Sequence, residues 1–326
     1  MVPSDVSVVI PAYNAESFIT DALDSILRQT LLPAEVIVVN DGSRDRTAHT
    51  IEQWIQQHQP AYPVHLINQE NKGIAATRNQ GIQRASSTWI AFLDADDVFE
   101  PLHLAVLLQT VALHPGAIGA FASGHLMIDG AVLEARYDDY WDNPGVTCGK
   151  KLDGVDAYVI GKSVFPRLIK GNFIKPSSLM VSRAQVNAVG LFNVDLGTAE
   201  DREFLVRLIM RGDFVYSPQS ITRYRWHDDN ASQVKNARRN MENGLRALKI
   251  IQGNASLGLS TVELKACTET ISTTAREYFY LSSLNGLLVY WKGICFMRDN
   301  FGWSVALVAL NLKNIARSFF HAGKRS

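Results

Sequence analysis

Short apolar runs alternate with helical segments through residues 6–93, and this alternation constrains the fold more than any other feature. It predicts strands at 6–10, 35–39, 64–68 and 89–93, with helices at 16–29, 47–57 and 73–85 between them. Parallel strands need such crossover connections, so we expect an α/β fold with a doubly wound, mostly parallel sheet. Ligands of such sheets bind beyond the carboxyl ends of the strands.

The pattern continues less regularly after residue 100. We expect helix and then strand over 101–122, a strand at 178–181, helices at 184–189 and 200–210, and a strand at 221–226. Residues 129–170 show no clean period and are predicted to be irregular. From residue 233 the sequence is helical without further strand signals, so we expect one α/β domain over 1–232 and a helical C-terminal extension over 233–326.

Composition and charge exclude several classes of protein. Lys and Arg number 32, as do Asp and Glu, so the zero net charge gives no reason to expect a nucleic-acid partner. Cys148, Cys267 and Cys295 form no CxxC pair, which argues against a disulfide framework or a zinc site and favours a reducing compartment. The sequence opens without a signal-peptide pattern, and no apolar stretch reaches the roughly 18 residues of a membrane span, so we expect a cytoplasmic protein.

Three carboxylates, Asp94, Asp96 and Asp97, directly follow the fourth predicted strand. Like charges packed at the end of a buried strand repel one another unless a cation neutralises them. Mg²⁺ and Mn²⁺ prefer oxygen ligands and often bridge one or two protein carboxylates to substrate phosphates. The motif therefore indicates a metal–diphosphate site. The alternative is a solvated acidic turn in which Asp97 caps the next helix.

Six motifs occur in order along residues 5–232: Pro11-Ala12-Tyr13-Asn14, residues 38–47, Asn71-Lys72-Gly73 with the helix to Asn79, residues 92–97, Ala199-Glu200-Asp201, and residues 224–232. In this order they resemble the motifs of the family 2 glycosyltransferases of GT-A fold. The resemblance implies transfer of a sugar from a nucleotide-diphosphate donor to an acceptor hydroxyl, with inversion at the anomeric carbon. It also implies that residues 1–100 bind the nucleotide sugar and that residues 101–232 bind the acceptor.

The resemblance assigns nucleotide-sugar binding to a set of residues in the first half of the chain, namely Pro11, Tyr13, Asp41, Arg78, Asp94 and Asp96. Asp41 would accept a hydrogen bond from the nucleotide base, either uracil or another base. The alternative is an Asp-Gly turn, in which the Asp side chain caps its own backbone. Tyr13 would pack on the base, or simply within its turn. Arg78 would reach the donor phosphates or pair with Asp94, or it would be an ordinary surface residue.

The resemblance also implies a divalent cation, Mn²⁺ or Mg²⁺, held by Asp96 and His227. The cation would neutralise the charge that develops on the departing diphosphate. His227 stands beside Asp228 and Asp229, so a surface imidazole is the alternative. Arg225 in the same segment would contact the diphosphate.

Inversion requires a base on the face opposite the leaving group, and the resemblance assigns that role to Asp201. Its neighbour Glu200 would bind or orient the acceptor. The alternative for both residues is simple stabilisation of a helix N-terminus, where acidic side chains are favoured.

The sequence indicates less about the acceptor than about the donor. Tyr137, Tyr140, Trp141 and Phe173 would form a platform for a sugar ring or would be small local cores. Residues 303–320 place Val305, Val308, Leu312, Ile315 and Phe319 on one helical stripe, which suits an anionic membrane surface, a core or a dimer contact. Membrane contact would fit a lipid-linked glycan acceptor at the inner face of the cell membrane, as in assembly of surface polysaccharides of the cell envelope.

Two other functions compete with this interpretation. A sugar nucleotidyltransferase would carry a Gly-rich basic loop after the first strand, where this chain has Pro11-Ala12-Tyr13-Asn14. A non-catalytic nucleotide-sugar-binding protein would keep the fold without the chemistry. The joint presence of Asp41, Asp94, Asp96, Asp201 and His227 favours a working enzyme.

Overall fold

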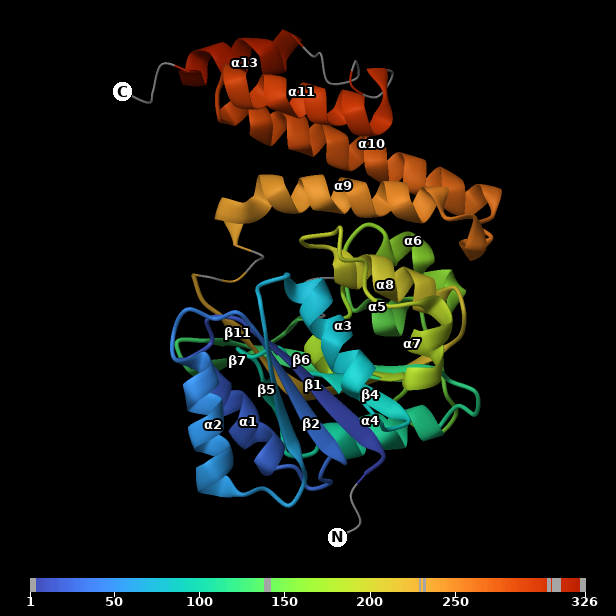
Figure 1. Ribbon diagram of the computed structural model, residues 1–326. Coiled ribbons are helices and arrows are strands. Elements are labelled where there is room, and N and C mark those ends of the chain that lie inside the picture. Colours follow the sequence, from blue (N-terminus) through green and yellow to red (C-terminus); the bar gives the residue numbers. More distant parts are fainter. Residues whose placement is uncertain are drawn as a thin grey trace. The chain divides into compact units, whose positions relative to one another are not determined.

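The structure is a computed structural model that describes residues 4–137, 142–228, 230, 233–303, 306 and 312–322. The chain divides into two compact units, residues 1–228 and residues 229–326 (Figure 1). Each unit is described by itself below.

The first unit is built on a sheet whose N-terminal part is parallel. Its first four strands are β1 (Val6–Ala12), β2 (Glu35–Asp41), β3 (Val64–Gln69) and β4 (Trp89–Phe92). They lie in the order β3-β2-β1-β4, with Val8 of β1 opposite Val36 of β2 and Ala91 of β4. The predicted strands and their parallel arrangement are confirmed.

The sheet continues beyond β4 with mixed directions. β10 (Leu179–Ser182) runs antiparallel to β4 and to β6 (Gly119–Ile128), and β6 pairs in parallel with the long β11 (Phe214–Trp226). The remaining strands are β5 (Val98–Phe99), β7 (Ala131–Arg136), β8 (Lys150–Lys151) and β9 (Tyr158–Ile160). Because β7 and β9 pair with β6 and β11, the prediction that residues 129–170 are irregular was wrong for these strands.

Helices cover both faces of the parallel part of the sheet (Figure 1). One face packs its apolar side chains against α1 (Ile19–Leu27), α2 (Thr47–His58) and α4 (His103–Ala112). The other face carries α3 (Ile74–Arg84), which lies so close to β1 that a Cβ atom at Gly81 would stand 2.3 Å from the Val9 side chain. Helices α5 (Pro144–Thr147), α6 (Phe165–Leu168), α7 (Arg183–Val189) and α8 (Glu200–Ile209) complete the unit. The doubly wound arrangement is therefore confirmed.

The second unit is helical in its described residues. It contains α9 (Ala237–Gly253), α10 (Thr261–Leu284), α11 (Leu287–Phe301) and α13 (Leu312–Ala322). Ser260 and Glu263 form a reciprocal capping box at the start of α10, and the Tyr278 hydroxyl of α10 donates a 2.7 Å hydrogen bond to Glu242 of α9. The capping box satisfies backbone groups at the start of α10, and the Tyr278 contact joins α10 to α9.

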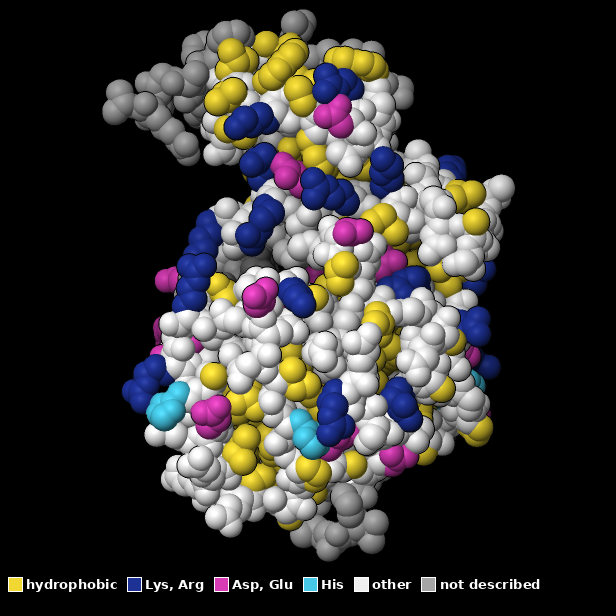
Figure 2. Space-filling view, viewed as in Figure 1, with side chains coloured by type: hydrophobic (Ala, Val, Ile, Leu, Met, Phe, Trp, Pro, Cys, Tyr) yellow, Lys and Arg dark blue, Asp and Glu magenta, His cyan; other side chains and the backbone are white. Residues whose placement is uncertain are grey.

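The surface of the C-terminal unit carries hydrophobic side chains among Lys and Arg (Figure 2). Leu288, Trp291 and Trp303 are more than half exposed. Of the stripe predicted over 303–320, Val305 and Val308 lie outside the described residues. Across the described part of the chain, no helix combines the length and the apolar character needed to cross a bilayer.

Candidate active site

The loops after β1, β2 and β4 lie at one edge of the sheet, because these strands are parallel neighbours. The first two loops are joined by reciprocal hydrogen bonds. The Asn14 N–H donates to Ser43 Oγ at 2.9 Å, and Asn14 Oδ1 accepts from the Arg44 N–H at 2.9 Å. Pro11 is buried in β1, whereas the Tyr13 side chain beside these loops is 48% exposed. The edge therefore presents an aromatic ring on a fixed backbone.

Asp41 ends β2 and is buried. Its carboxylate accepts hydrogen bonds from Gln69 Nε2 at 2.7 Å, from the Lys72 N–H at 2.8 Å and from the Gly73 N–H at 2.9 Å. The carboxylate thereby fixes the loop that leads into α3. This contact gives Asp41 a structural role, and its expected contact with a nucleotide base stays a prediction.

Arg78 on α3 joins two motifs that are far apart in the sequence. Its Nη2 lies 2.7 Å from Asp94 Oδ1, and its Nη1 lies 2.7 Å from Glu200 Oε1. The Arg78 side chain is buried, so the alternative of an ordinary surface arginine is wrong. Burial favours the neutral guanidine, but the charges of Asp94 and Glu200 outweigh this effect and raise the pKa of Arg78. Arg78 is thus a buried cation that holds two carboxylates.

Asp96 faces His227 at the other side of the acidic motif. Asp96 Oδ2 lies 3.0 Å from His227 Nε2, and both side chains are partly exposed. Arg225 donates from Nε to the Asp96 carbonyl oxygen at 2.9 Å and from Nη2 to Asp21 at 2.6 Å. The His227 ring packs against the Phe18 ring at 4.7 Å between centroids. The structure therefore brings together the two residues that the sequence predicts as cation ligands.

Asp97 has a different environment from its neighbours. It is buried, accepts from Ser177 Oγ at 2.6 Å and accepts from the Arg225 N–H at 3.0 Å. Burial and the charges of Asp96 and Asp94 raise its pKa well above the usual range. The alternative in which Asp97 is a solvated cap of the next helix is therefore wrong.

The donor set of the acidic motif suits a divalent cation bound together with phosphate. Burial, followed by the charge of Asp94, raises the pKa of Asp96, and a cation would relieve this repulsion. Among the described residues, no group of three or more His, Cys, Asp or Glu forms a complete metal site. Mg²⁺ and Mn²⁺ nevertheless need only one or two protein carboxylates when phosphate oxygens supply other ligands. Asp96 and His227 fit that arrangement.

Glu200 and Asp201 begin α8 after Ala199, which adopts a left-handed backbone with a φ of 66°. Glu200 is buried, and burial together with the Asp201 charge raises its pKa to about 7, although Arg78 opposes the shift. Asp201 is half-buried, and its Oδ2 accepts a hydrogen bond from Asn172 Nδ2 at 2.7 Å. The two adjacent acids therefore have different partners.

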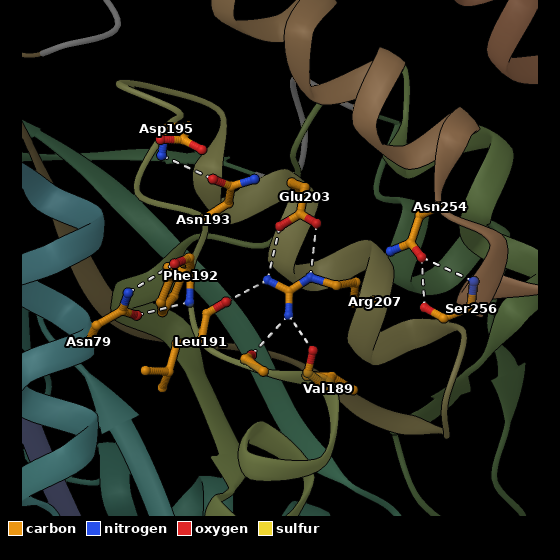
Figure 3. A network of polar contacts seen from close by, with 11 residues as sticks. Asn79, Val189, Leu191, Phe192, Asn193, Asp195, Glu203, Arg207, Asn254 and Ser256 are labelled. Carbon is orange, nitrogen blue, oxygen red and sulfur yellow. Dashed lines mark hydrogen bonds and ion pairs between the residues drawn. The ribbon is translucent and has the colours of Figure 1, made fainter.

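A clamp of polar contacts holds the chain between α7 and α8 (Figure 3). Arg207 pairs with Glu203 on its own helix and donates to the carbonyl oxygens of Val189, Gly190 and Leu191 at 2.7 to 2.8 Å. Asn79, the neighbour of Arg78, exchanges two 2.8 Å hydrogen bonds with the Phe192 backbone. These contacts tie α8 to α3 and so fix Glu200 beside Arg78.

Sequence reasoning missed a third group of residues at the site. Asn172, Lys175 and Ser177 contact or face the acidic residues from the segment before β10. They follow the region without a clean period, so no periodic signal in the sequence indicates them. Of the predicted aromatic platform, Phe173 is 5% exposed and lies 6.3 Å from the Phe121 ring, so it belongs to a local core. Tyr140 and Trp141 lie outside the described residues.

The sequence profile of the family described as Glycosyl transferase family 2 matches residues 7–139. An uncharacterized glycosyltransferase of Haemophilus influenzae is 27% identical over 241 residues, which cover 72% of this chain and 69% of that protein. Residues 7–139 of the chain therefore belong to the family 2 glycosyltransferases.

Shorter matches are more similar to this chain over the residues that they cover. The uncharacterized glycosyltransferase EpsJ of Bacillus subtilis is 42% identical over 92 residues, covering 28% of this chain and 26% of EpsJ. The putative teichuronic acid biosynthesis glycosyltransferase TuaG of the same organism is 31% identical over 151 residues, covering 44% of this chain and 59% of TuaG. The chain thus spans less than two thirds of the length of EpsJ and of TuaG.

Solved structures share the fold of this chain. Residues 1–349 of Staphylococcus aureus TarS in complex with UDP-GlcNAc give a TM-score of 0.62 at 18% identity, covering 90% of this chain and 81% of that chain. The mannosyltransferase PcManGT of Pyrobaculum calidifontis, solved with GDP-Man and Mn²⁺, gives a TM-score of 0.61 at 16% identity, covering 98% of this chain and 85% of that chain. The predicted GT-A fold is therefore confirmed.

Proposed function

We propose that this chain transfers a sugar from a nucleoside-diphosphate donor to an acceptor hydroxyl, with inversion at the anomeric carbon. The single observation that carries the proposal is the Arg78 bridge, which joins Asp94 of the acidic motif to Glu200 of the later acidic pair at 2.7 Å each. In this proposal residues 1–232 form the transferase domain and residues 233–326 its helical extension.

Asp201 acts as the base. It takes the proton of the acceptor hydroxyl while the acceptor oxygen bonds to the anomeric carbon and the bond from that carbon to the diphosphate oxygen breaks. The nucleoside diphosphate leaves with the bonding electron pair. Asp201 suits this role because it is half-buried and Asn172 holds one of its oxygens. Glu200, held by Arg78, orients the acceptor from the neighbouring position.

Pro11, Tyr13 and Asp41 form the base-binding edge, and Arg78, Asp94 and Asp96 face the ribose and the diphosphate. Support comes from the exposed Tyr13 ring beside loops that hydrogen bonds hold together. Uridine diphosphate sugars are the proposed donors. TarS was solved with UDP-GlcNAc and PcManGT with GDP-Man, so both bases are compatible with this fold.

Asp96 and His227 would hold a divalent cation, Mn²⁺ or Mg²⁺. When bound, the cation supplies positive charge that stabilises the departing diphosphate. The support is the donor set itself, an imidazole and a carboxylate 3.0 Å apart in a motif with excess negative charge.

The proposed acceptor is a glycan or a lipid-linked glycan of the cell envelope, reached at the inner face of the membrane. Support is indirect: TuaG carries the name of a teichuronic acid biosynthesis enzyme, and the C-terminal unit exposes Trp291 and Trp303. Aromatic side chains of this kind suit a membrane interface. Sedimentation with anionic vesicles would test the membrane contact, and recovery of the chain only in the supernatant would contradict it.

The test of the transfer reaction is Asp201→Asn compared with Asp195→Asn, which makes the same change at an exposed loop residue. Thermal shifts with UDP, GDP, dTDP and CDP, each with and without Mn²⁺, report donor binding. Release of the nucleoside diphosphate from a matching sugar donor reports turnover. We expect Asp201→Asn to keep the thermal shift and to lose at least about 100-fold in turnover. Equal turnover in both variants would show that Asp201 is not the base, whereas a thermal shift without turnover in the unsubstituted chain would favour a non-catalytic nucleotide-sugar-binding protein.

A further inference from the structure

One short segment contacts both halves of the proposed site. Asn172 Nδ2 donates to Asp201 Oδ2 at 2.7 Å, and five positions later Ser177 Oγ donates to Asp97 Oδ2 at 2.6 Å. Ser177 Oγ also accepts from the Asp94 N–H at 3.0 Å. The segment therefore sets the spacing between the proposed base and the acidic motif.

Lys175 lies between these two contacts in the sequence. Its Nζ stands 4.5 Å from the centre of the Tyr137 ring, and its surroundings include the Asp201 and Asp97 carboxylates. Burial favours neutral Lys175, but Tyr137, Asp201 and Asp97 outweigh burial and raise its pKa. Lys175 is thus a charged ammonium group among acids. Arg78 pairs with Asp94 and Glu200, and the Asp201 charge contributes to raising the pKa of both Arg78 and Lys175.

Tyr137 connects Lys175 to Asn172. Its hydroxyl donates to the Asn172 carbonyl oxygen at 3.1 Å, while its ring lies beside the ammonium group. Asn172 is itself fixed, because its Oδ1 accepts from the Ile174 N–H at 3.0 Å and only its amide nitrogen then faces Asp201. Tyr137 therefore links Lys175 to Asn172, and Asn172 in turn donates to the Asp201 carboxylate.

We infer that Asn172 and Lys175 are positioning residues for Asp201. Asn172 fixes the rotation of the carboxylate through Oδ2, and Lys175, held beside the Tyr137 ring that hydrogen-bonds Asn172, contributes positive charge on the same side of the site. The inference rests on the proposed role of Asp201 as the base. It assigns Asn172 and Lys175 to the transfer step and not to donor binding, so the two steps respond differently when these residues change.

Asn172→Asp is the sharpest variant because it is nearly isosteric. The aspartate keeps the oxygen that accepts from the Ile174 N–H. It replaces the N–H donor that faces Asp201 with a carboxylate oxygen, and so places a second negative charge beside Asp201. Asn143→Asp is the matched control, since Asn143 uses its Oδ1 to accept from the Val146 N–H at 3.3 Å in the same unit. Lys175→Met removes the cation, and Lys175→Arg keeps a positive charge.

We expect Asn172→Asp and Lys175→Met to lower kcat at least about tenfold while the donor KM changes less than about threefold. Lys175→Arg should retain most of the activity, and Asn143→Asp should retain all of it. The thermal shift with UDP and Mn²⁺ checks that each variant is folded and binds the donor. A rise in donor KM with unchanged kcat would overturn the inference, as would full activity of Asn172→Asp and Lys175→Met.

A double-mutant cycle separates this inference from the proposed function. If Asn172 acts through Asp201, then Asn172→Asp should change the residual rate of Asp201→Asn by less than about twofold. A further tenfold loss in that background would show a merely structural role. If Asp201→Asn keeps the full rate, the proposed base is wrong. If only Asp201→Asn loses activity, the proposed function survives and the positioning roles fail.

Discussion

Arg78 and Glu200 are 122 positions apart in the sequence, and Arg78 Nη1 donates a 2.7 Å hydrogen bond to Glu200 Oε1. The same guanidinium uses Nη2 to hold Asp94. A planar guanidinium can serve two carboxylates at once because its donors form a rigid fork, which a flexible ammonium group does not provide. This relationship makes the geometry of the site depend on one buried side chain.

Arg78→Lys is expected to keep the charge and lose one of the two contacts. Leaving one buried carboxylate unpaired should cost about 2–4 kcal/mol of unfolding free energy and should lower turnover more than about tenfold. Arg84→Lys is the matched control on the same helix, where the side chain is 45% exposed. Urea unfolding and nucleoside-diphosphate release would measure both effects, and equal behaviour of the two variants would contradict the bridge.

Glu200 should make stability depend on pH near neutrality. Its pKa is raised to about 7 in the folded protein from 4.5, so the folded state keeps a proton that the unfolded state releases between these values. This contribution is present below pH 4.5 and is lost as the pH rises to 7. The unfolding free energy of the wild type relative to Glu200→Gln should therefore fall, by up to about 1.4 kcal/mol per pH unit. A difference that stays constant over this range would contradict the raised pKa.

His103 should contribute to acid denaturation. It is buried, its Nδ1 lies 2.9 Å from the Ile221 carbonyl oxygen, and burial lowers its pKa to about 3. Its stabilising effect is present above pH 6.5 and is lost as the pH falls toward 3, because only the unfolded state takes up the proton. When the pH falls from 7 to 5, the unfolding free energy of the wild type should decrease by about 2 kcal/mol more than that of His103→Asn. In this variant the amide nitrogen replaces the Nδ1 donor. Parallel pH profiles from urea unfolding would refute this expectation.

Gly42 and Gly73 offer a matched pair for the loops beside Asp41. Both have positive φ, at 67° and 84°, but a Cβ atom at Gly42 would stand 2.8 Å from the Asn71 backbone nitrogen, whereas Gly73 faces open space. Gly73 has a ψ of 165°, in a region that is essentially restricted to glycine, so Gly73→Ala should cost about 1–3 kcal/mol for the backbone conformation alone. Gly42→Ala should cost about 2 kcal/mol more because backbone must also move. Equal losses in thermal or urea unfolding would show that the loop adapts freely.

The parallel half of the fold and much of the site were predictable because their signals are local. Strand periodicity placed the polar loops after β1, β2 and β4, and parallel pairing then brought those loops to one edge. The hairpin between β6 and β7 also had a local signal that was missed. Asp129 and Gly130, both with positive φ, form the two-residue turn that Asp-Gly favours between strands.

The contacts around Asp201 could not be predicted in the same way. Asn172 reaches Asp201 across 29 positions, and Arg78 reaches Glu200 across 122. No periodicity encodes which distant polar side chains will meet, since this depends on the sheet order β4-β10-β6 and on the turn held by Arg207. Asp97 shows the same limit, because its sequence context matched that of Asp96 while its partners differ.

Asn14 donates to the Ser43 side chain and accepts from the Arg44 backbone N–H. These two hydrogen bonds have a thermodynamic consequence. Two loops that hold each other are already ordered, so under the proposed function little conformational entropy would remain to be lost when a base packs against Tyr13. Affinity at this edge is then set by the contacts themselves, and association should be as fast as diffusion and orientation allow. If this edge binds the nucleotide base as proposed, the affinities of different bases would differ only through their own contacts with it.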